Sequence, residues 1–469
     1  MLPEPILAAA VRRPLGGISI IGGAGCSLDE PTSIPLSRRC SEDAYHQLEA
    51  DGLLKASDCA EDAHALAEVV GDLSKLADIV YKKYGSQQYL VDRLPISKFR
   101  FARANEGYLL LGALFREQVI ASFVTLNFDL AVLNALSNVG AEEEVAIIRC
   151  PEEHGNHRAH NVVYLHRSVE ANADDWILRT EQFDSAWASG WQELIALRVV
   201  SNPITVFVGL GTVAGVLIQS VVKVRTAAPA GTQVYLVNPG AKERSPYFQV
   251  LTLPDENYIQ LGWAEFMEQL SDRVLVEQRR RLVSSCLDAR AAEALDENDV
   301  GAIVSRATAA GLLGLGSLRA RWMMKPGDYH PEREAELPFI ASVLIALRVI
   351  EKYMKAEAVF REYAAVDFKD GAKSVLCAAF IIVPGKRWLA LEGTLHRLQR
   401  RWSGQNPAPS CVFVCGAVGP RLKDAEPPED LVSADKPDRI VSPSIDALYD
   451  VEEVRLNPAI ALSNLEHER

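Results

Sequence analysis

The apolar run ISIIGGAGCS (residues 18 to 27) ends in glycines and a small polar pair, a pattern with the chemistry to hold a phosphate. Glycines let a backbone turn with positive φ and approach a ligand closely, and N–H groups at a following helix start can bind an anion. Two known signatures do not fit: Leu28 stands where a G-x-G-x-x-G motif from Gly23 needs glycine, and no Gly-Lys-Ser/Thr occurs. An ordinary tight turn explains the stretch equally well.

Polar residues also follow two later apolar runs. Asn127 and Asp129 stand in TLNFD, and His166 ends NVVYLH. An imidazole near its ordinary pKa can take a proton at neutral pH. Each residue has a structural explanation as well, because Asn and Asp commonly cap helices and a histidine that ends an apolar strand is more often structural.

A rival cluster lies in CPEEHGNHRAH, residues 150 to 160. Cys150, His154, His157 and His160 are residue types that zinc accepts. Their spacing matches no common zinc module, and Gly155-Asn156 breaks any helix that would align the histidines. We therefore interpret the segment as a polar loop and expect no metal.

These residues need elements that position them, and the first half of the chain supplies a series of strand-like runs. They are GISIIGG (17–23), ASFVTLN (121–127), NVVYLH (161–166), ITVFVGLG (204–211) and TQVYLVN (232–238), with helical patterns between them. Continuous β-branched runs are typical of parallel strands buried on both faces. The sequence therefore predicts a doubly wound α/β sheet, whose strand ends converge on a ligand crevice.

The domain plan follows from length and pattern. With 469 residues, two or three domains are expected. We predict an N-terminal domain over 1–285 with a helical insertion at roughly 28–120 lying over the crevice, in which 58–85 forms an amphipathic helix. A C-terminal α/β or α+β domain over 286–469 mixes helices such as 337–366 with strands, and 423–439 forms an exposed loop.

Charge and composition exclude some functions. The net charge of −13 argues against broad nucleic-acid binding. Eight scattered cysteines without a signal-peptide pattern indicate a reducing compartment, and hence a cytoplasmic protein. The uncharged run 204–222 approaches membrane-spanning length, but its glycines favour a buried strand, a turn and a buried helix.

The strand ends taken together resemble the sirtuin-like NAD-consuming family over roughly residues 15–275. GAGCS (23–27) is similar to the family's Gly-Ala-Gly-x-Ser loop, and SIP (33–35) to its Ile-Pro. TLNFD (125–129) resembles its Thr-x-Asn-x-Asp segment, and YLHRSV (164–169) its Leu-His-Gly. VFVGLGTV (206–213) and VYLVN (234–238) resemble its Gly-Thr-Ser loop and adenosine-side Asn.

The departures from the family are informative. The two Cys-x-x-Cys pairs that hold zinc in protein-deacylating sirtuins do not occur, and Arg167 replaces the glycine after the catalytic histidine. The Asp-Phe-Arg after Ile-Pro is missing too, which puts an acyl-lysine tunnel in doubt. What remains resembles the bacterial anti-phage sirtuin-like effectors that hydrolyse NAD.

The resemblance implies a role for each matched residue. Asn127 would position water or ribose, Asp129 would support the ribose or loop, and His166 would act as general base. The implied cofactor-binding residues are Gly23, Ala24, Gly25, Ser27, Thr125, Gly209, Gly211 and Asn238. The implied activity is NAD+ glycohydrolysis that releases nicotinamide and ADP-ribose, with NAD as substrate.

Two alternatives stay open, namely an NAD-dependent protein deacylase or ADP-ribosyltransferase, and a non-catalytic module that senses NAD or ADP-ribose. An enzyme that destroys a universal cofactor needs restraint. The C-terminal domain is therefore a candidate for sensing, for homo-oligomerisation, or for docking a protein partner such as an Argonaute-like protein or a hexameric ATPase.

Overall fold

The computed structural model describes residues 2 to 467 except 13–15, 186–189, 212, 214, 228–230, 291–294, 324–336, 392–394, 396–397, 399, 403 and 420–447. The loop expected at 423–439 and Thr212 of the segment 206–213 lie outside the described residues. The chain divides into two compact units, Met1–Val274 and Leu275–Arg469. The dividing point falls within helix α14 (Trp263–Ala289), whereas the predicted boundary lies near residue 285.

The first unit contains a seven-stranded sheet in the order β3-β4-β2-β1-β5-β6-β7, in which every pair of neighbours is parallel. Its strands are β1 (Ile18–Gly22), β2 (Ile120–Thr125), β3 (Ala146–Ile148), β4 (Asn161–Tyr164), β5 (Ile204–Val208), β6 (Gln233–Val237) and β7 (Tyr258–Ile259). The doubly wound α/β prediction is thereby confirmed. β3 and β7 were not predicted.

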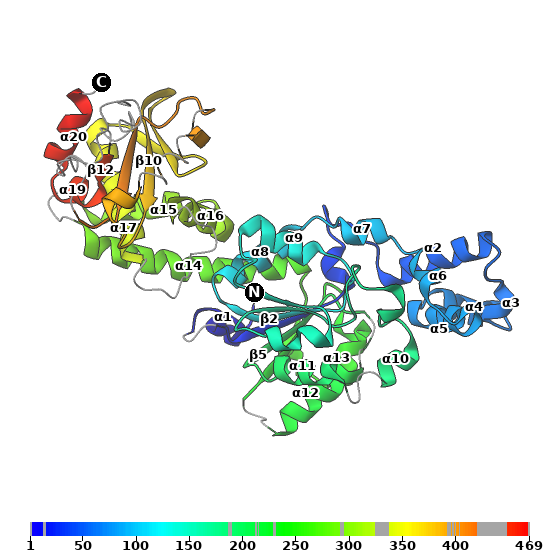
Figure 1. Cartoon of the computed structure of the whole chain (residues 1–469). Helices are drawn as coiled ribbons and strands as arrows, with labels where there is room; N and C mark the ends of the chain where they lie inside the picture. The colour runs from blue at the N-terminus through cyan, green and yellow to red at the C-terminus, as the bar shows by residue number, and fades with distance from the viewer. Residues whose placement is uncertain are drawn as a thin grey trace. The chain divides into compact units, whose positions relative to one another are not determined.

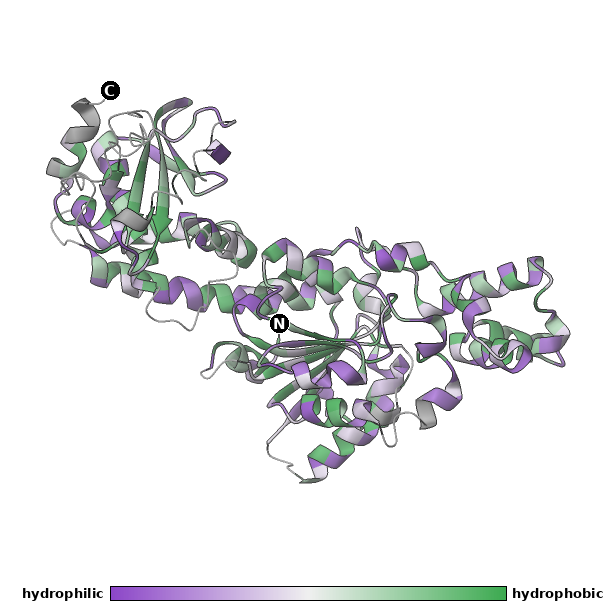
Figure 2. Cartoon of the chain, in the orientation of Figure 1, coloured by the Kyte–Doolittle hydropathy of each residue, from purple (hydrophilic) through white to green (hydrophobic). Residues whose placement is uncertain are grey.

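Helices cover both faces of this sheet. In Figure 1, α8 and α9 lie on one side of it, and α11, α12 and α13 on the other. The bounds are α1 (Glu4–Val11), α8 (Glu106–Arg116), α9 (Ala131–Val139), α10 (Thr180–Ser185), α11 (Trp191–Val200), α12 (Gly215–Ala227) and α13 (Pro246–Leu251). Every residue of β1, β2 and β5 is buried, and the strands are accordingly green in Figure 2. Burial on both faces explains why these strands read as unbroken apolar runs.

The crossover from β1 to β2 contains the predicted helical insertion, which projects from the sheet in Figure 1. Its helices are α2 (Ser37–Ala50), α3 (Ala56–Cys59), α4 (Ala63–Val70), α5 (Leu73–Tyr84), α6 (Gln88–Val91) and α7 (Ile96–Arg100). The single helix predicted over 58–85 is wrong. Asp62 and Asp72 cap α4 and α5 by accepting backbone N–H bonds, so the chain restarts a helix at each.

Short 3₁₀ helices complete the first unit: η1 (Ala24–Ser27), η2 (Pro151–Asn156), η3 (Ala173–Asp175), η4 (Lys242–Arg244) and η5 (Asp255–Asn257). The uncharged run 204–222 forms β5 and the start of α12, as predicted, but α12 is only partly buried: Leu217 and Val221 are buried, whereas Val222 is 53% exposed. Among the described residues, no single helix has the length and hydropathy of a membrane span. In the same described residues, one pair of helices, α15 (Glu297–Ala307) and α16 (Gly311–Met323), reaches that length and composition when taken together, but the two are bent by 97°.

The second unit contains a mixed five-stranded sheet in the order β12-β11-β10-β9-β8. Its strands are β8 (Glu357–Phe360), β9 (Ala365–Asp370), β10 (Lys373–Ile382), β11 (Cys411–Cys415) and β12 (Leu448–Asp450). Its helices are α15 (Glu297–Ala307), α16 (Gly311–Met323), α17 (Leu337–Met354), η7 (Trp388–Leu391), α19 (Val451–Leu456) and α20 (Pro458–His467). The helix predicted over 337–366 stops at Met354, and Lys355 with φ of 52° turns the chain into the β8–β9 hairpin.

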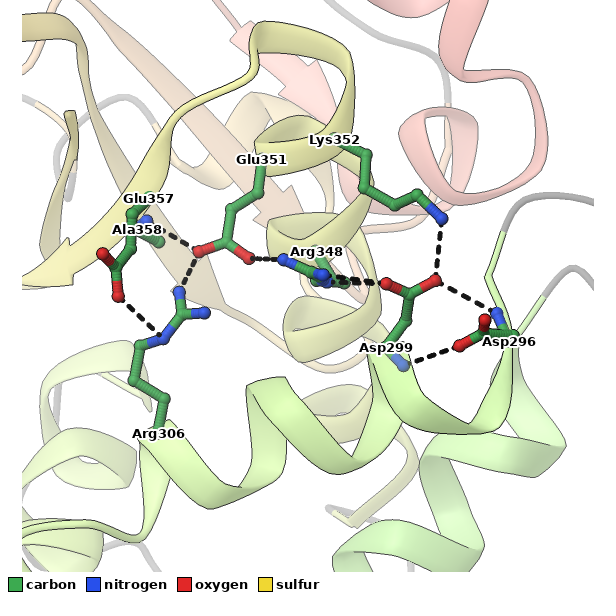
Figure 3. Close-up of polar contacts among 8 residues, drawn as sticks. All are labelled: Asp296, Asp299, Arg306, Arg348, Glu351, Lys352, Glu357 and Ala358. Carbon is green, nitrogen blue, oxygen red and sulfur yellow. Dashed lines mark hydrogen bonds and ion pairs between the residues drawn. The ribbon is translucent and has the colours of Figure 1, made fainter. Parts of the chain in front are cut away.

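A charged network joins α15, α17 and β8 within this second unit (Figure 3). Glu351, almost fully buried, accepts hydrogen bonds from Arg306, from Arg348 at 3.0 Å and from the Ala358 amide at 2.7 Å. Asp299 accepts from Arg348 at 2.8 Å and from Lys352 at 2.7 Å. Burial alone would raise the pKa of Asp299, but its hydrogen bonds lower that pKa to about 2. Asp299 is therefore charged and paired at neutral pH.

Candidate functional site

The site is placed by the position of β1 between β2 and β5 in the sheet. The chain leaves β1 toward β2 on one side, and β5 pairs with it on the other, which makes a topological switch point. Open α/β sheets bind ligands in the crevice outside the carboxyl ends of strands at such a point. The residues that follow these strands are Gly23, Leu126 and Gly209.

The two glycine loops after β1 and β5 are in direct backbone contact. The Gly23 N–H donates to the Val208 carbonyl at 3.0 Å, and the Gly25 N–H to the Gly209 carbonyl at 2.9 Å. A Cβ on Gly25 would lie 2.8 Å from the Gly209 Cα, and Gly209 itself has φ of 63°. Two amides of the predicted phosphate loop are thus engaged with β5, so a diphosphate there would need other donors.

Substitution of Gly25 tests this packing. Gly25→Ala is expected to lower the free energy of unfolding by about 1–3 kcal/mol, because its methyl group meets backbone that cannot rotate away. Gly211→Ala is the matched control, since a Cβ there meets nothing within 4 Å. Urea unfolding of both variants measures the difference. Equal free energies of unfolding for the two variants would contradict the close packing of Gly25 against Gly209.

Ser27, Asn127 and Asp129 come together in a buried cluster of hydrogen bonds. Ser27 Oγ lies 2.8 Å from Asp129 Oδ2, and Asn127 Nδ2 lies 3.1 Å from Ser27 Oγ and 3.0 Å from the Gly23 carbonyl. Asp129 Oδ1 also accepts from the Ala131 amide at the start of α9. The structure therefore brings three of the predicted site residues into one network.

Two further residues shape this cluster. Thr125 Oγ1 accepts the Asn127 amide at 3.0 Å, so its hydroxyl fixes the turn after β2. The Tyr108 hydroxyl lies 2.9 Å from Ser27 Oγ and 3.4 Å from Asn127 Nδ2, and its side chain is buried. Tyr108 was not predicted, although a tyrosine in the apolar helix GYLLLGALF was an available signal, because a buried hydroxyl usually needs a partner.

His166 lies just beyond β4, beside the loop that carries Asn127. Its ring centroid is 6.4 Å from that of Phe128, which stacks on Trp176 at 4.2 Å. Burial lowers the pKa of His166 to about 4, against the smaller raising effect of a hydrogen bond with the Leu126 backbone. This value lies below the ordinary imidazole pKa expected from the sequence, because the ring is desolvated.

The residue after the histidine has a backbone conformation that favours glycine. Arg167 has φ of 78°, in the left-handed region that costs a non-glycine residue about 1–2 kcal/mol. Its side chain donates to the Arg149 carbonyl at 3.1 Å and lies over the Trp191 ring. These contacts offset part of the strain at Arg167.

Buried His166 also makes stability depend on pH. Its unfolded pKa is 6.5 and its folded pKa about 4, so the unfolded chain takes the proton first. The stability gained from burying the neutral ring is present above pH 6.5 and is lost as pH falls toward 4, by about 3 kcal/mol. His166→Asn is expected to remove this pH-dependent part of the stability, which denaturation at pH 7 and pH 4.5 measures. If the wild type and the variant lose the same free energy of unfolding between these pH values, His166 is not the group responsible.

Two predicted cofactor residues lie on the β5–β6 side of the crevice. Asn238 follows β6, and its Oδ1 accepts a hydrogen bond from the Gly240 backbone N–H at 2.8 Å, which fixes the turn after β6. Gly211 is exposed. Neither belongs to the Ser27–Asn127–Asp129 cluster.

A cavity of about 90 Å³ lies between the strand ends and the helical insertion. Ala24, Ser27, Asn127 and Asp129 line it from the strand ends, and Ser37, Cys40 and Leu73 line it from α2 and α5. Ordinary ligand pockets have volumes of about 300–1,000 Å³. This cavity is therefore smaller than a typical ligand pocket.

The residues of the Cys150–His160 segment are arranged for packing. Residues 151–156 form η2, and the rings of His154 and His157 meet edge to face at 5.0 Å. His157 Nδ1 lies 3.2 Å from Asn161 Oδ1, and His160 Nδ1 lies 2.7 Å from the Ile120 carbonyl. Within the described parts of the chain, no three His, Cys, Asp or Glu side chains are grouped to hold a metal.

No protein-family model matches the sequence, and no curated protein matches it significantly. Solved structures similar to this chain include a Sir2 homologue in complex with ADP-ribose, at 16% identity and a TM-score of 0.32 over 59% of this chain and 98% of that one. Another is Sir2 with a p53 peptide and NAD+, at 15% identity and a TM-score of 0.34 over 59% of this chain and 100% of that one. With identities and TM-scores this low, these similarities leave the function to be inferred from the site itself.

Proposed function

We propose that the first unit hydrolyses NAD+ at the bond between nicotinamide and ribose. One observation carries the proposal: a hydroxyl, an amide and a carboxylate (Ser27, Asn127, Asp129) form one buried network beside a cavity at the switch point of the sheet. A dinucleotide is the ligand that doubly wound sheets commonly bind in this crevice.

The chemistry needs few groups from the protein. Water forms a bond to the ribose C1′, the C1′–N bond breaks with its electrons going to nicotinamide, and the water loses a proton. The leaving group is already cationic and needs no acid, so the site must orient water and stabilise an oxocarbenium-like state. In this proposal Asn127 orients the water or a ribose hydroxyl, and Asp129 supports the ribose or the loop through its hydrogen bond with Ser27.

His166 is the proposed proton acceptor. With a pKa lowered to about 4 by burial, it is a weak base. Access of water to the ring would raise its pKa toward the ordinary value, because desolvation is the main cause of the shift. Catalysis is thus proposed to be coupled to solvent access at His166.

We further propose a regulated, cytoplasmic role in which NAD depletion serves anti-phage defence. Such an enzyme must be restrained until needed, and the second unit is the candidate for sensing, homo-oligomerisation or docking a protein partner. The small volume of the cavity supports restraint, because it is below that of ordinary ligand pockets.

The test is incubation of the full chain with NAD+, with and without an acyl-lysine peptide, followed by separation of the products. Equal amounts of nicotinamide and ADP-ribose without peptide are expected. Nicotinamide release that requires the peptide and matches its deacylation would favour the deacylase instead. Saturable NAD+ binding by calorimetry without turnover would favour the sensor, and neither binding nor turnover would overturn the NAD assignment.

A further inference from the structure

The start of α8 is tied to the glycine loop after β1. Asn105 caps α8 by accepting the Tyr108 amide at 3.1 Å, and its own Nδ2 donates to the Cys26 carbonyl at 2.8 Å. The backbone N–H of Asn105 in turn donates to Thr32 Oγ1 at 3.1 Å. The helix that carries Tyr108 is therefore fixed relative to Ser27.

Packing fixes the Tyr108 ring as well. It meets Phe123 at 6.1 Å and Trp263 at 5.6 Å between ring centroids, both edge to face. Only 1% of the residue is exposed. Its hydroxyl is thus held against Ser27 and Asn127 rather than free to rotate into solvent.

The hydrogen bonds of this cluster have one direction. A backbone carbonyl only accepts, so the Asn127 atom 3.0 Å from the Gly23 oxygen is the amide nitrogen. Ser27 has a single proton, which it donates to Asp129 Oδ2 at 2.8 Å. Tyr108 must then donate to Ser27 Oγ, which also accepts from Asn127 Nδ2.

This direction decides what Asn127 presents to a ligand. Its two N–H groups point to the Gly23 carbonyl and to Ser27 Oγ, and the residue lines the cavity. The carbonyl oxygen Oδ1 is the atom of the side chain that these contacts do not use. Asn127 therefore meets a ligand as a hydrogen-bond acceptor, which suits water or a ribose hydroxyl.

We propose that Tyr108 is a positioning residue for the reaction: by donating to Ser27 Oγ it holds the Asn127 amide with Oδ1 toward the substrate. This role rests on the proposed function for the identity of the substrate. In Tyr108→Phe, Ser27 Oγ loses the hydrogen bond that the Tyr108 hydroxyl donates. Ser27 and the Asn127 amide can then adopt other orientations.

The first measurement is steady-state NAD+ hydrolysis by Tyr108→Phe. We expect kcat to fall about tenfold to a hundredfold with KM changed less than about twofold, because orientation rather than binding is lost. Tyr164→Phe is the matched control: its hydroxyl is also buried, but donates to the Asp129 backbone carbonyl at 3.0 Å. It is expected to keep kcat within about threefold.

A double-mutant cycle of Tyr108 and Asn127 distinguishes a positioning role from simple stabilisation of the fold. In an Asn127→Ala background, Tyr108→Phe should change kcat less than about twofold, because the group it orients is gone. Effects that add fully, or equal losses of kcat in the Tyr108 and Tyr164 variants, would overturn the inference.

A second readout does not depend on turnover. In the full chain labelled with ¹⁵N-asparagine, the Asn127 side-chain amide is identified by its loss in Asn127→Ala. We expect Tyr108→Phe to shift or broaden that signal and Tyr164→Phe to leave it in place. An unmoved signal in Tyr108→Phe overturns the positioning role. If the wild type does not hydrolyse NAD+, the proposed function fails and this signal alone decides the role of Tyr108.

Discussion

Alanine at position 127 is expected to lower kcat for NAD+ hydrolysis at least a hundredfold, which corresponds to about 2.7 kcal/mol of transition-state stabilisation. The amide is the polar group that links the glycine loop, Ser27 and the cavity, so its loss removes both an orienting acceptor and a brace of the loop. His166→Ala is expected to show a loss of the same order, since the proposed proton acceptor disappears. Nicotinamide release under saturating NAD+ measures both.

Asn138→Ala provides the control for the Asn127 substitution. Asn138 is exposed on α9, and its amide contacts only the Asn134 side chain at 3.3 Å among the bonds shown by the structure. The same chemical change there should leave kcat within about twofold. Unchanged activity in the Asn127 and His166 variants would mean that the reaction occurs elsewhere.

The second large effect concerns the network of Figure 3. Glu351→Ala is expected to lower the free energy of unfolding of the second unit by about 3–5 kcal/mol. The carboxylate is almost fully buried, and its removal leaves Arg306 and Arg348 without this counter-charge and the Ala358 amide without its acceptor. Hydrogen exchange of peptides from α15, α17 and β8 across a urea series reports this unit separately from the first.

Glu357→Ala is the matched control, because Glu357 pairs with the same Arg306 at 3.6 Å but its side chain is 71% exposed. Exposed ion pairs contribute about 0–1 kcal/mol, so this variant should unfold close to the wild type. A loss for Glu351→Ala as small as that for Glu357→Ala would show that the buried network does not stabilise the unit.

Much of the first sheet could be predicted because its central strands are buried on both faces. A run such as ITVFV has no charged residue and is β-branched or aromatic throughout, and this pattern distinguishes a buried parallel strand from an exposed one. β3 and β7 have only three and two residues at the sheet edges, too few for any periodicity. They could be found only through their pairing with β4 and β6.

The errors within helices have a different cause. Apolar spacing continued through Gly71-Asp72 and through Lys355, although the backbone breaks at both places. Capping by Asp72 and positive φ at Lys355 are local features that a stripe of apolar residues does not reveal. The hairpin after α17 is extended by β10, which follows β9 directly and pairs with it antiparallel.

Part of the candidate site was predictable and part was not. Ser27, Asn127 and Asp129 were named because each follows a strand, and parallel strands bring their ends together. Tyr108 comes from the middle of a crossover helix, whose contact with Ser27 depends on how α8 packs on the sheet. The low pKa of His166 likewise depends on Phe128 and the surrounding fold, which burial creates and the sequence does not display.

The central place of β1 has a consequence for how the protein is made. Ser27 meets Asp129 across 102 residues, and Cys26 Sγ approaches the Val208 carbonyl across 182. Contacts so distant in sequence close large loops and form late in folding. During synthesis on the ribosome, the glycine loop after β1 gains its hydrogen bonds to Val208 and Gly209 only after β5 has been made. Chains that stop short of β5 therefore lack the finished site.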